Sequence, residues 1–451
     1  MSAPMCRKVT SRLIQHLTKI SALRLQYPDQ SYCKILSYTK NTICTTPRRS
    51  AVNKNPETRR FHGSGIPLKV LGIETSCDDT GAAIVDEDRN VLGEALNSQT
   101  QVHVQHGGII PTVAQDLHKI NIEDVVTEAL EKANMTIKDV DAIATTVKPG
   151  MGLSLRIGLE YGKKLVRESG KPFIPIHHME AHALTVRLIE KVDFPYLVFL
   201  LSGGHCLLAV VRDVEDFLLL GTTLDDAPGD VYDKVARKLN LKLVPECHGL
   251  SGGAAVELLA QKGDPTAFEF PHIRTQHRDC NFSFVGIRTF VERLTEMEEE
   301  KFGIKDGDIL PNVSDVCASF QYCVLRQLAK RLQVALLYCE IKSLLPVENK
   351  TLVLSGGVAS NMFIRQGLSK LCRQHSCHVV CPPPRLCTDN GVMIAWNGVE
   401  KFSRGLGVVS DFESVRFQPK SPLGVDMISD VQSSYIKPNK VAADHSDNKI
   451  S

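Results

Sequence analysis

An alternation of apolar strand patterns with helical patterns constrains the fold most, and it extends from residue 69 to about residue 405. Segments such as Lys69–Glu74 and Thr351–Ser355 predict buried strands. Between them, Asp116–Lys132 and Ser314–Tyr338 carry apolar residues at helical spacing. This alternation predicts an α/β fold. With 451 residues, 43% of them hydrophobic, the chain is long enough to form two cores.

One strand–turn–strand plan occurs twice in the chain. Val70–Val85 (VLGIETSCDDTGAAIV) and Leu197–Val211 (LVFLLSGGHCLLAVV) each contain an apolar strand, a short polar turn and a second apolar strand. Such repetition predicts two similar lobes, each directing a hairpin turn toward a shared cleft. A generic likeness between any two β-hairpins is the alternative interpretation.

The first 60 residues differ from the rest in charge. They contain twelve Lys and Arg residues, two acidic residues and six serines. This composition is typical of a mitochondrial transit peptide, and a disordered basic arm that binds nucleic acid is the alternative. The remaining chain has 41 basic and 49 acidic residues, so RNA binding by that part requires a local basic patch. No run approaches about 18 apolar residues, so we expect no membrane span.

A histidine-rich heptapeptide, Ile176–His182 (IHHMEAH), is a candidate metal site. His178 and His182 are four residues apart, so on a helix both can face a single ion. In the H-E-x-x-H motif of metalloproteases the glutamate directly follows the first histidine. Glu180 instead lies roughly 200° around the helix from His178. The spacing leaves two interpretations open: a metal site without a protease base, or a solvated helix start.

Three polar turns have the composition of phosphate-binding loops. They are TSCDDT (Thr75–Thr80), SGGH (Ser202–His205) and SGGV (Ser355–Val358), and each follows a predicted strand. Glycines allow successive backbone N–H groups to converge on an anion. Asp78 and Asp79 in the first turn are candidate catalytic residues, because paired acids hold a cation or position a nucleophile. An Asx turn is the structural alternative for them.

Seven motifs occur in this order along the chain: GIETSCDDT, HHMEAH, LLSGGH, TLDDAPGDVYDKVAR, NFSFVGIRT, SGGVASN and TDNGVMIAW. Together they resemble the tRNA N6-adenosine threonylcarbamoyltransferase family in its mitochondrial form, formerly named O-sialoglycoprotein endopeptidase. The match covers residues 69 to about 415. Some positions depart from the family pattern, such as Asp78-Asp79 where many relatives have Asp-Glu.

The resemblance implies a two-lobed actin-like and Hsp70-like ATPase fold, with duplicated lobes around a nucleotide cleft. We expect the first lobe over residues 66–190 with about 385–420, and the second lobe over residues 191–384. A transit peptide and flexible leader over residues 1–60 precede them. A polar, unpacked tail over residues 424–451 follows them.

The resemblance also implies an activity. The family transfers a threonylcarbamoyl group from threonylcarbamoyl-AMP, made by a separate synthase, to the N6 amine of the adenosine 3′ of the anticodon. The expected substrates are mitochondrial tRNAs that read ANN codons, and AMP is released. We expect a homodimer in the mitochondrial matrix with no membrane association. The alternatives are an ATP-dependent kinase of a small metabolite, a metalloprotease and a non-catalytic nucleotide-binding scaffold.

Site residues follow from the family pattern. His178, His182 and Asp389 correspond to the ligands of one divalent ion per subunit, Zn²⁺ or Fe²⁺. Gly253 and Glu257 follow VPECHGLSGG, a segment longer than its usual counterpart. The residues expected to bind the acyl-adenylate are Leu200, Leu201, Ser202, Gly203, Gly204, Asp233, Gly253, Glu257 and Asn361.

Overall fold

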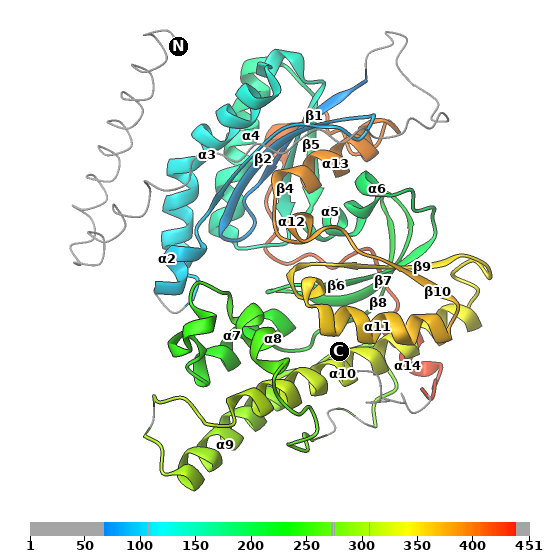
Figure 1. Ribbon diagram of the computed structural model, residues 1–451. Helices are drawn as coiled ribbons and strands as arrows, with labels where there is room; N and C mark the ends of the chain where they lie inside the picture. Colours follow the sequence, from blue (N-terminus) through cyan, green and yellow to red (C-terminus); the bar gives the residue numbers. More distant parts are fainter. Residues whose placement is uncertain (1–66, 106–107, 272–273, 275, 306, 439–451) are drawn as a thin grey trace. The chain divides into compact units, whose positions relative to one another are not determined.

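The computed structural model describes residues 67–105, 108–271, 274, 276–305 and 307–438 (Figure 1). The predicted transit peptide over residues 1–60 lies outside these residues. The chain separates into two units, Met1–Gly63 and Ser64–Ser451, and all the described helices and strands belong to the second unit.

Five strands form the first sheet, in the order β3-β2-β1-β4-β5. β2 runs antiparallel to both of its neighbours, whereas β1, β4 and β5 are parallel to one another. The carboxyl ends of these three parallel strands therefore meet at one edge of the sheet. The strands are β1 (Lys69–Glu74), β2 (Asp79–Asp86), β3 (Val91–Ser98), β4 (Ala142–Lys148) and β5 (Phe173–His177).

The second sheet repeats this plan. Its strand order is β10-β9-β6-β7-β8-β11. The first five of these strands correspond, in position and in direction, to β5, β4, β1, β2 and β3 of the first sheet. The prediction of duplicated α/β lobes is therefore confirmed. The strands are β6 (Tyr196–Leu201), β7 (Cys206–Asp213), β8 (Asp216–Thr222), β9 (Lys350–Ser355), β10 (Cys377–Val380) and β11 (Val425–Asp426).

Helices cover both faces of each sheet (Figure 1). In the first lobe, α3 (Pro111–Ala133) and α4 (Gly152–Ser169) pack on one face, and α13 (Gly391–Phe402) packs on the other. In the second lobe, a large core lies between the sheet and α7, α8, α9, α10 and α11. These five helices are Pro228–Lys238, Gly252–Ala260, Val285–Phe302, Val313–Ile341 and Met362–Gln374.

Helix α5 (His178–Leu184) contacts the cores of both lobes. Its Ala181 packs with the first sheet and α13, whereas Met179 and Ala183 pack with β6, β7 and β9 of the second sheet. The remaining described helices are short: α2 (Thr100–Gln105), α6 (Val186–Ile189), α12 (Pro384–Cys387) and α14 (Ile428–Ser433). Among the described helices, none combines the length and the apolar composition needed to cross a membrane.

The expectation of an unpacked tail from residue 424 is wrong for the part that the structure describes. β11 pairs with β8, and α14 buries Val431 completely. Ile436 is buried as well. Met427 and Val431 are four residues apart, so they share one face of a helical turn that meets the second-lobe core. The packing needs only these few apolar residues, which the polar composition of the segment obscured.

Candidate metal centre

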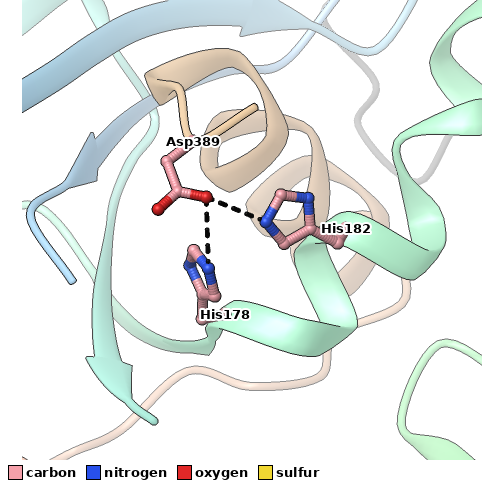
Figure 2. A group of neighbouring side chains, drawn as sticks. All are labelled: His178, His182 and Asp389. Carbon is pink, nitrogen blue, oxygen red and sulfur yellow. Dashed lines mark hydrogen bonds and ion pairs between the residues drawn. The ribbon is translucent and has the colours of Figure 1, made fainter. Parts of the chain in front are cut away.

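His178 and His182 lie on one face of α5, which starts directly after β5 (Figure 2). The first residue outside the helix, His177, accepts a hydrogen bond from the backbone N–H of Met179 through its side chain. The apolar residues of α5 face the two cores, so its histidine face is directed toward the loop before α13. Both histidines are buried.

Asp389 reaches the same place from the N-terminal end of α13. Asn390 caps this helix by accepting a hydrogen bond of 2.9 Å from the N–H of Met393. Gly391 allows the helix to lie against the first sheet, because a Cβ atom there would come within 2.4 Å of the Ala82 backbone. This close approach of α13 to β2 places Asp389 beside α5.

The three side chains have the spacing of ligands around one small ion (Figure 2). Asp389 Oδ1 lies 3.4 Å from His178 Nε2 and 3.1 Å from His182 Nε2. Atoms bound at metal–ligand distances of 2.0–2.2 Å around a tetrahedral ion are separated by about 3.3 Å. All three ligand atoms lie within 4.8 Å of one another. Two imidazole nitrogens and one carboxylate oxygen thus fit a divalent transition metal.

Glu74 holds His178 from the opposite side. Its Oε2 lies 3.2 Å from His178 Nδ1, and the Ser76 hydroxyl lies 3.1 Å from the same nitrogen. The Glu74 carboxylate is fully buried and also accepts hydrogen bonds from Thr146 Oγ1 and from the Ser76 N–H. A carboxylate can only accept, so Nδ1 of His178 carries a proton. In a neutral ring, Nε2 then presents its lone pair toward Asp389, as a metal ligand requires.

The charges of the site call for a cation. Burial alone lowers the pKa of His178, but the Asp389 and Glu74 carboxylates outweigh it and raise that pKa to about 10. Burial raises the pKa of Asp389, and the adjacent His178 and His182 reverse this and hold it well below its usual range. The buried Glu74 carboxylate and the half-buried Asp389 carboxylate therefore flank His178, and a proton or a metal ion must lie between the ring and Asp389.

Glu180 lies outside this centre. Its carboxylate pairs with Lys401 Nζ at 2.8 Å, and Lys401 also pairs with Glu215. The interpretation as a metalloprotease therefore lacks its base, as the spacing of the motif predicted.

His205 of the SGGH turn lies close to the centre, with its ring centroid 6.4 Å from that of His178. Burial, with smaller contributions from His178 and His182, lowers the pKa of His205 to about 4. His205 of the SGGH turn therefore lies near the metal centre with a neutral imidazole ring.

The TSCDDT turn is held in shape by His118 of α3. His118 Nε2 lies 2.9 Å from the Cys77 carbonyl, and Nδ1 lies 2.7 Å from the Thr80 hydroxyl. Because the carbonyl only accepts, Nε2 carries the proton and Nδ1 accepts from Thr80. Within this turn, burial raises the pKa of Asp79 to about 7, and the neighbouring carboxylates of Asp78, Asp389 and Glu74 add to the increase.

The two glycine turns of the second lobe lie next to each other. β6 pairs with β9 in parallel, with Leu200 opposite Ser355, so both turns follow the same edge of the sheet. Gly356 has φ of +96°, and a Cβ atom there would come within 2.4 Å of the Leu201 carbonyl oxygen. Leu200 and Leu201 are buried strand residues, whereas Gly203 and Gly204 are exposed in the turn.

The other predicted adenylate residues form a second cluster on α7, α8 and the start of α11. Asp233 accepts hydrogen bonds from the backbone N–H groups of Gly252 and Gly253. Glu257 Oε1 accepts from the N–H of Met362 at 2.7 Å. Asn361 caps α11 through its Oδ1 and donates to Gln321 through its Nδ2 at 2.8 Å. These side chains link α7, α8, α10 and α11. The backbone of Asn361 is also engaged, because its N–H donates to the Val358 carbonyl and its carbonyl accepts from the Arg365 N–H.

Sequence reasoning missed Glu74, Ser76, Thr146 and His118. Glu74 had a visible signal, since it is an acid at the end of an otherwise apolar predicted strand. Burial of a carboxylate requires a partner. His118 had none, because its partners lie about 40 residues away and only the fold brings them together.

A family model and similar curated proteins indicate the same family for this chain. The TsaD family model, described as tRNA N6-adenosine threonylcarbamoyltransferase, matches residues 90–396. The chain is 53% identical over 393 residues to the mitochondrial tRNA N6-adenosine threonylcarbamoyltransferase of Homo sapiens, covering 87% of this chain and 95% of that protein. It is 41% identical over 366 residues to the tRNA N6-adenosine threonylcarbamoyltransferase of Rhodospirillum rubrum, covering 80% and 96%.

Solved structures match with low identity. HypF of T. kodakarensis aligns with a TM-score of 0.48 and 14% identity, over 76% of this chain and 50% of that one. A ROK family glucokinase from Streptomyces griseus aligns with a TM-score of 0.36 and 13% identity, over 75% and 99%. The family model and the identity to the curated relatives decide the assignment: the chain belongs to the tRNA N6-adenosine threonylcarbamoyltransferase family, and its enzymatic activity is the threonylcarbamoylation of tRNA.

Proposed function

We propose that the protein transfers the threonylcarbamoyl group of threonylcarbamoyl-AMP to the N6 amine of the adenosine 3′ of the anticodon, with release of AMP. The proposed substrates are mitochondrial tRNAs that read ANN codons, and the proposed location is the mitochondrial matrix. Membership of the family supports the reaction. Relatives that are named mitochondrial, including those of Mus musculus and Danio rerio, support the compartment.

The observation that carries this proposal is the convergence of two Nε2 atoms on Asp389 Oδ1, with Glu74 behind one of them. His178, His182 and Asp389 would hold one divalent ion, Zn²⁺ or Fe²⁺, since both metals accept imidazole and carboxylate ligands. A bound ion of this kind supplies Lewis acidity, which polarises a carbonyl or phosphoryl oxygen. Three protein ligands leave positions open for a substrate.

The chain's own groups supply the remaining functions. The exposed backbone of Gly203 and Gly204 offers N–H groups to the adenylate phosphate. Asp79 would accept the proton that the adenosine amine loses on attack, because a pKa near 7 suits a base that works at neutral pH. The cluster around Asp233 and Glu257 would border the nucleoside of the adenylate. We also propose a homodimer that receives its adenylate from a separate synthase.

Reconstitution tests the proposal. Purified protein with Zn²⁺ or Fe²⁺, threonylcarbamoyl-AMP and an unmodified mitochondrial tRNA transcript should form threonylcarbamoyladenosine, measured by mass spectrometry of the digested nucleosides. A transcript with guanosine in place of the target adenosine should stay unmodified. Phosphorylation of a sugar in place of this product would favour the kinase alternative. Full activity of both His178→Ala and Asp389→Ala would contradict the metal assignment.

A further inference from the structure

A cavity of about 530 Å³ lies in the second lobe, between residues 276–278 and the segment of α14 and the residues after it. Its walls include the side chains of His277, Arg278, Gln432, Ser433 and Tyr435. Among the described residues, no aspartate or glutamate lines it. The cavity therefore combines cationic, aromatic and hydrogen-bonding groups, and it shares no residue with the metal centre or the three glycine or aspartate turns.

Arg331 of α10 fixes the wall of the cavity that residues 276–278 form. This arginine is 1% exposed, and its guanidinium donates to the carbonyl oxygens of Arg274, His277 and Asp279 at 3.0, 2.8 and 2.8 Å. Arg274 also pairs with the Asp279 carboxylate at 2.6 Å. These bonds fix the backbone on both sides of His277 and Arg278, so the positions of these two residues are fixed as well.

The other wall is fixed by the packing of α14. Val431 and Ile436 are buried in the second-lobe core on either side of Gln432 and Tyr435. The one acid of α14, Asp430, does not line the cavity, because its carboxylate accepts from Tyr338 and pairs with Lys342 at 2.9 Å. The carboxylate of Asp430 therefore does not neutralise Arg278, the arginine that lines the cavity.

Tyr435 and Arg278 lie next to each other in the lining of the cavity. The Tyr435 side chain is 72% exposed, which is unusual for a large ring on a packed segment. The guanidinium carbon of Arg278 lies 5.7 Å from the centre of this ring, within cation–π range. Proteins bind single-stranded RNA through this pair of groups, the ring stacking on a base and the arginine contacting a phosphate.

We propose that this cavity docks one phosphate and the adjoining base of the substrate tRNA, at a position other than the adenosine that is modified. The inference rests on the proposed function, which brings a tRNA to the enzyme in every turnover. It also answers a requirement of the sequence, since the chain after residue 60 carries more acidic than basic residues and needs a local basic site for RNA. Phosphate contacts of this kind set the register of a nucleic acid on a protein.

Equilibrium binding of an unmodified tRNA transcript to the full chain, measured at several salt concentrations, tests the docking site. Arg278→Ala should weaken binding about tenfold and reduce the slope of log K against log salt by about one. Tyr435→Ala should weaken binding about tenfold and leave the slope unchanged, because stacking releases no counterion. Both variants should raise KM for tRNA and leave kcat unchanged. Arg293→Ala, an exposed arginine on α9, is the matched control and should bind as the wild type does.

The outcomes separate this proposal from the proposed function. Wild-type dissociation constants and slopes in both variants would overturn the docking site while the wild type still modifies tRNA. The same result, with an acidic protein captured at this face, would assign the cavity to a protein partner and overturn it equally. If the wild type binds tRNA with the expected dependence on Arg278 and Tyr435 but forms no threonylcarbamoyladenosine, the docking site stands and the proposed function fails. Melting temperatures of both variants should equal that of the wild type, because both side chains lie at the surface.

Discussion

Glu74→Gln should weaken metal binding to His178, His182 and Asp389 while the fold stays intact. Gln has nearly the same shape as Glu, but it is neutral and one of its two terminal atoms is a donor. Oε1 of Glu74 accepts from the Ser76 N–H, and Oε2 accepts from Thr146 and from His178. Whichever way the amide is turned, its NH₂ group faces at least one of these donors. The ring of His178 then loses either its anchor or the negative charge that makes Nε2 a strong ligand.

The magnitude follows from the behaviour of partners that orient metal ligands, whose loss costs about 10- to 100-fold in metal affinity, or roughly 1.4–2.7 kcal/mol. Competition with a chromophoric chelator measures the dissociation constant for Zn²⁺ or Co²⁺, and the visible absorption of the Co²⁺ form reports the ligand geometry. Glu128→Gln, which removes an exposed charge from α3, is the control. An affinity within twofold of the wild type, with an unchanged Co²⁺ spectrum, would refute the role assigned to Glu74.

Three further predictions follow from the geometry. His182→Ala should remove measurable metal binding in the same chelator assay and lower the rate of tRNA modification by at least about 10³-fold, since two ligands rarely hold a metal; retained stoichiometric binding would contradict this. Folding raises the pKa of Asp79, so ionisation of this carboxyl group destabilises the fold as pH rises from about 4 toward 7. Asp79→Asn should therefore increase the free energy of unfolding by about 2 kcal/mol at pH 8 and by much less at pH 4, measured by urea titration of the metal-free protein. Equal effects at both pH values would exclude this pKa shift. Gly391→Ala should cost about 1–3 kcal/mol in the same titrations, because its Cβ atom meets the Ala82 backbone, whereas Gly357→Ala has open space and should change stability little.

The sequence predicted the parts of the fold that have a strong local period. β1 and β6 have the bounds expected from their apolar runs, and the helix expected over Ser314–Tyr338 is α10 (Val313–Ile341). The strands that were missed, β3, β5, β8, β10 and β11, are edge or next-to-edge strands of the two sheets. Of these, β3 and β10 expose part of their residues, so their apolar patterns are broken.

For the candidate site, the sequence could place the metal ligands only through the family pattern. The spacing of His178 and His182 indicates one helical face, but Asp389 lies 207 positions after His182, and no local pattern joins them. The close packing of α13 on β2, which the absence of a side chain at Gly391 allows, brings Asp389 to the two histidines. Partners such as Glu74 and Thr146 belong to neighbouring strands, so the sheet register determines their meeting.

The placement of α5 has a consequence for motion between the lobes. Trp396 of α13 donates to the Leu184 carbonyl of α5 at 3.2 Å, which ties the histidine helix to the helix that follows Asp389. The three candidate ligands are therefore tied to one another through α13 and the first-lobe sheet, although α5 also packs on the second sheet through Met179 and Ala183, and the two glycine turns belong to that second sheet. A rotation between the lobes would change the distance from the three ligands to the glycine turns, and it would have to move the second sheet past Met179 and Ala183. The hydrogen bond from Trp396 would keep the three ligands together during this movement. In the proposed reaction, an opening of this kind to release AMP would not require the three ligands to separate.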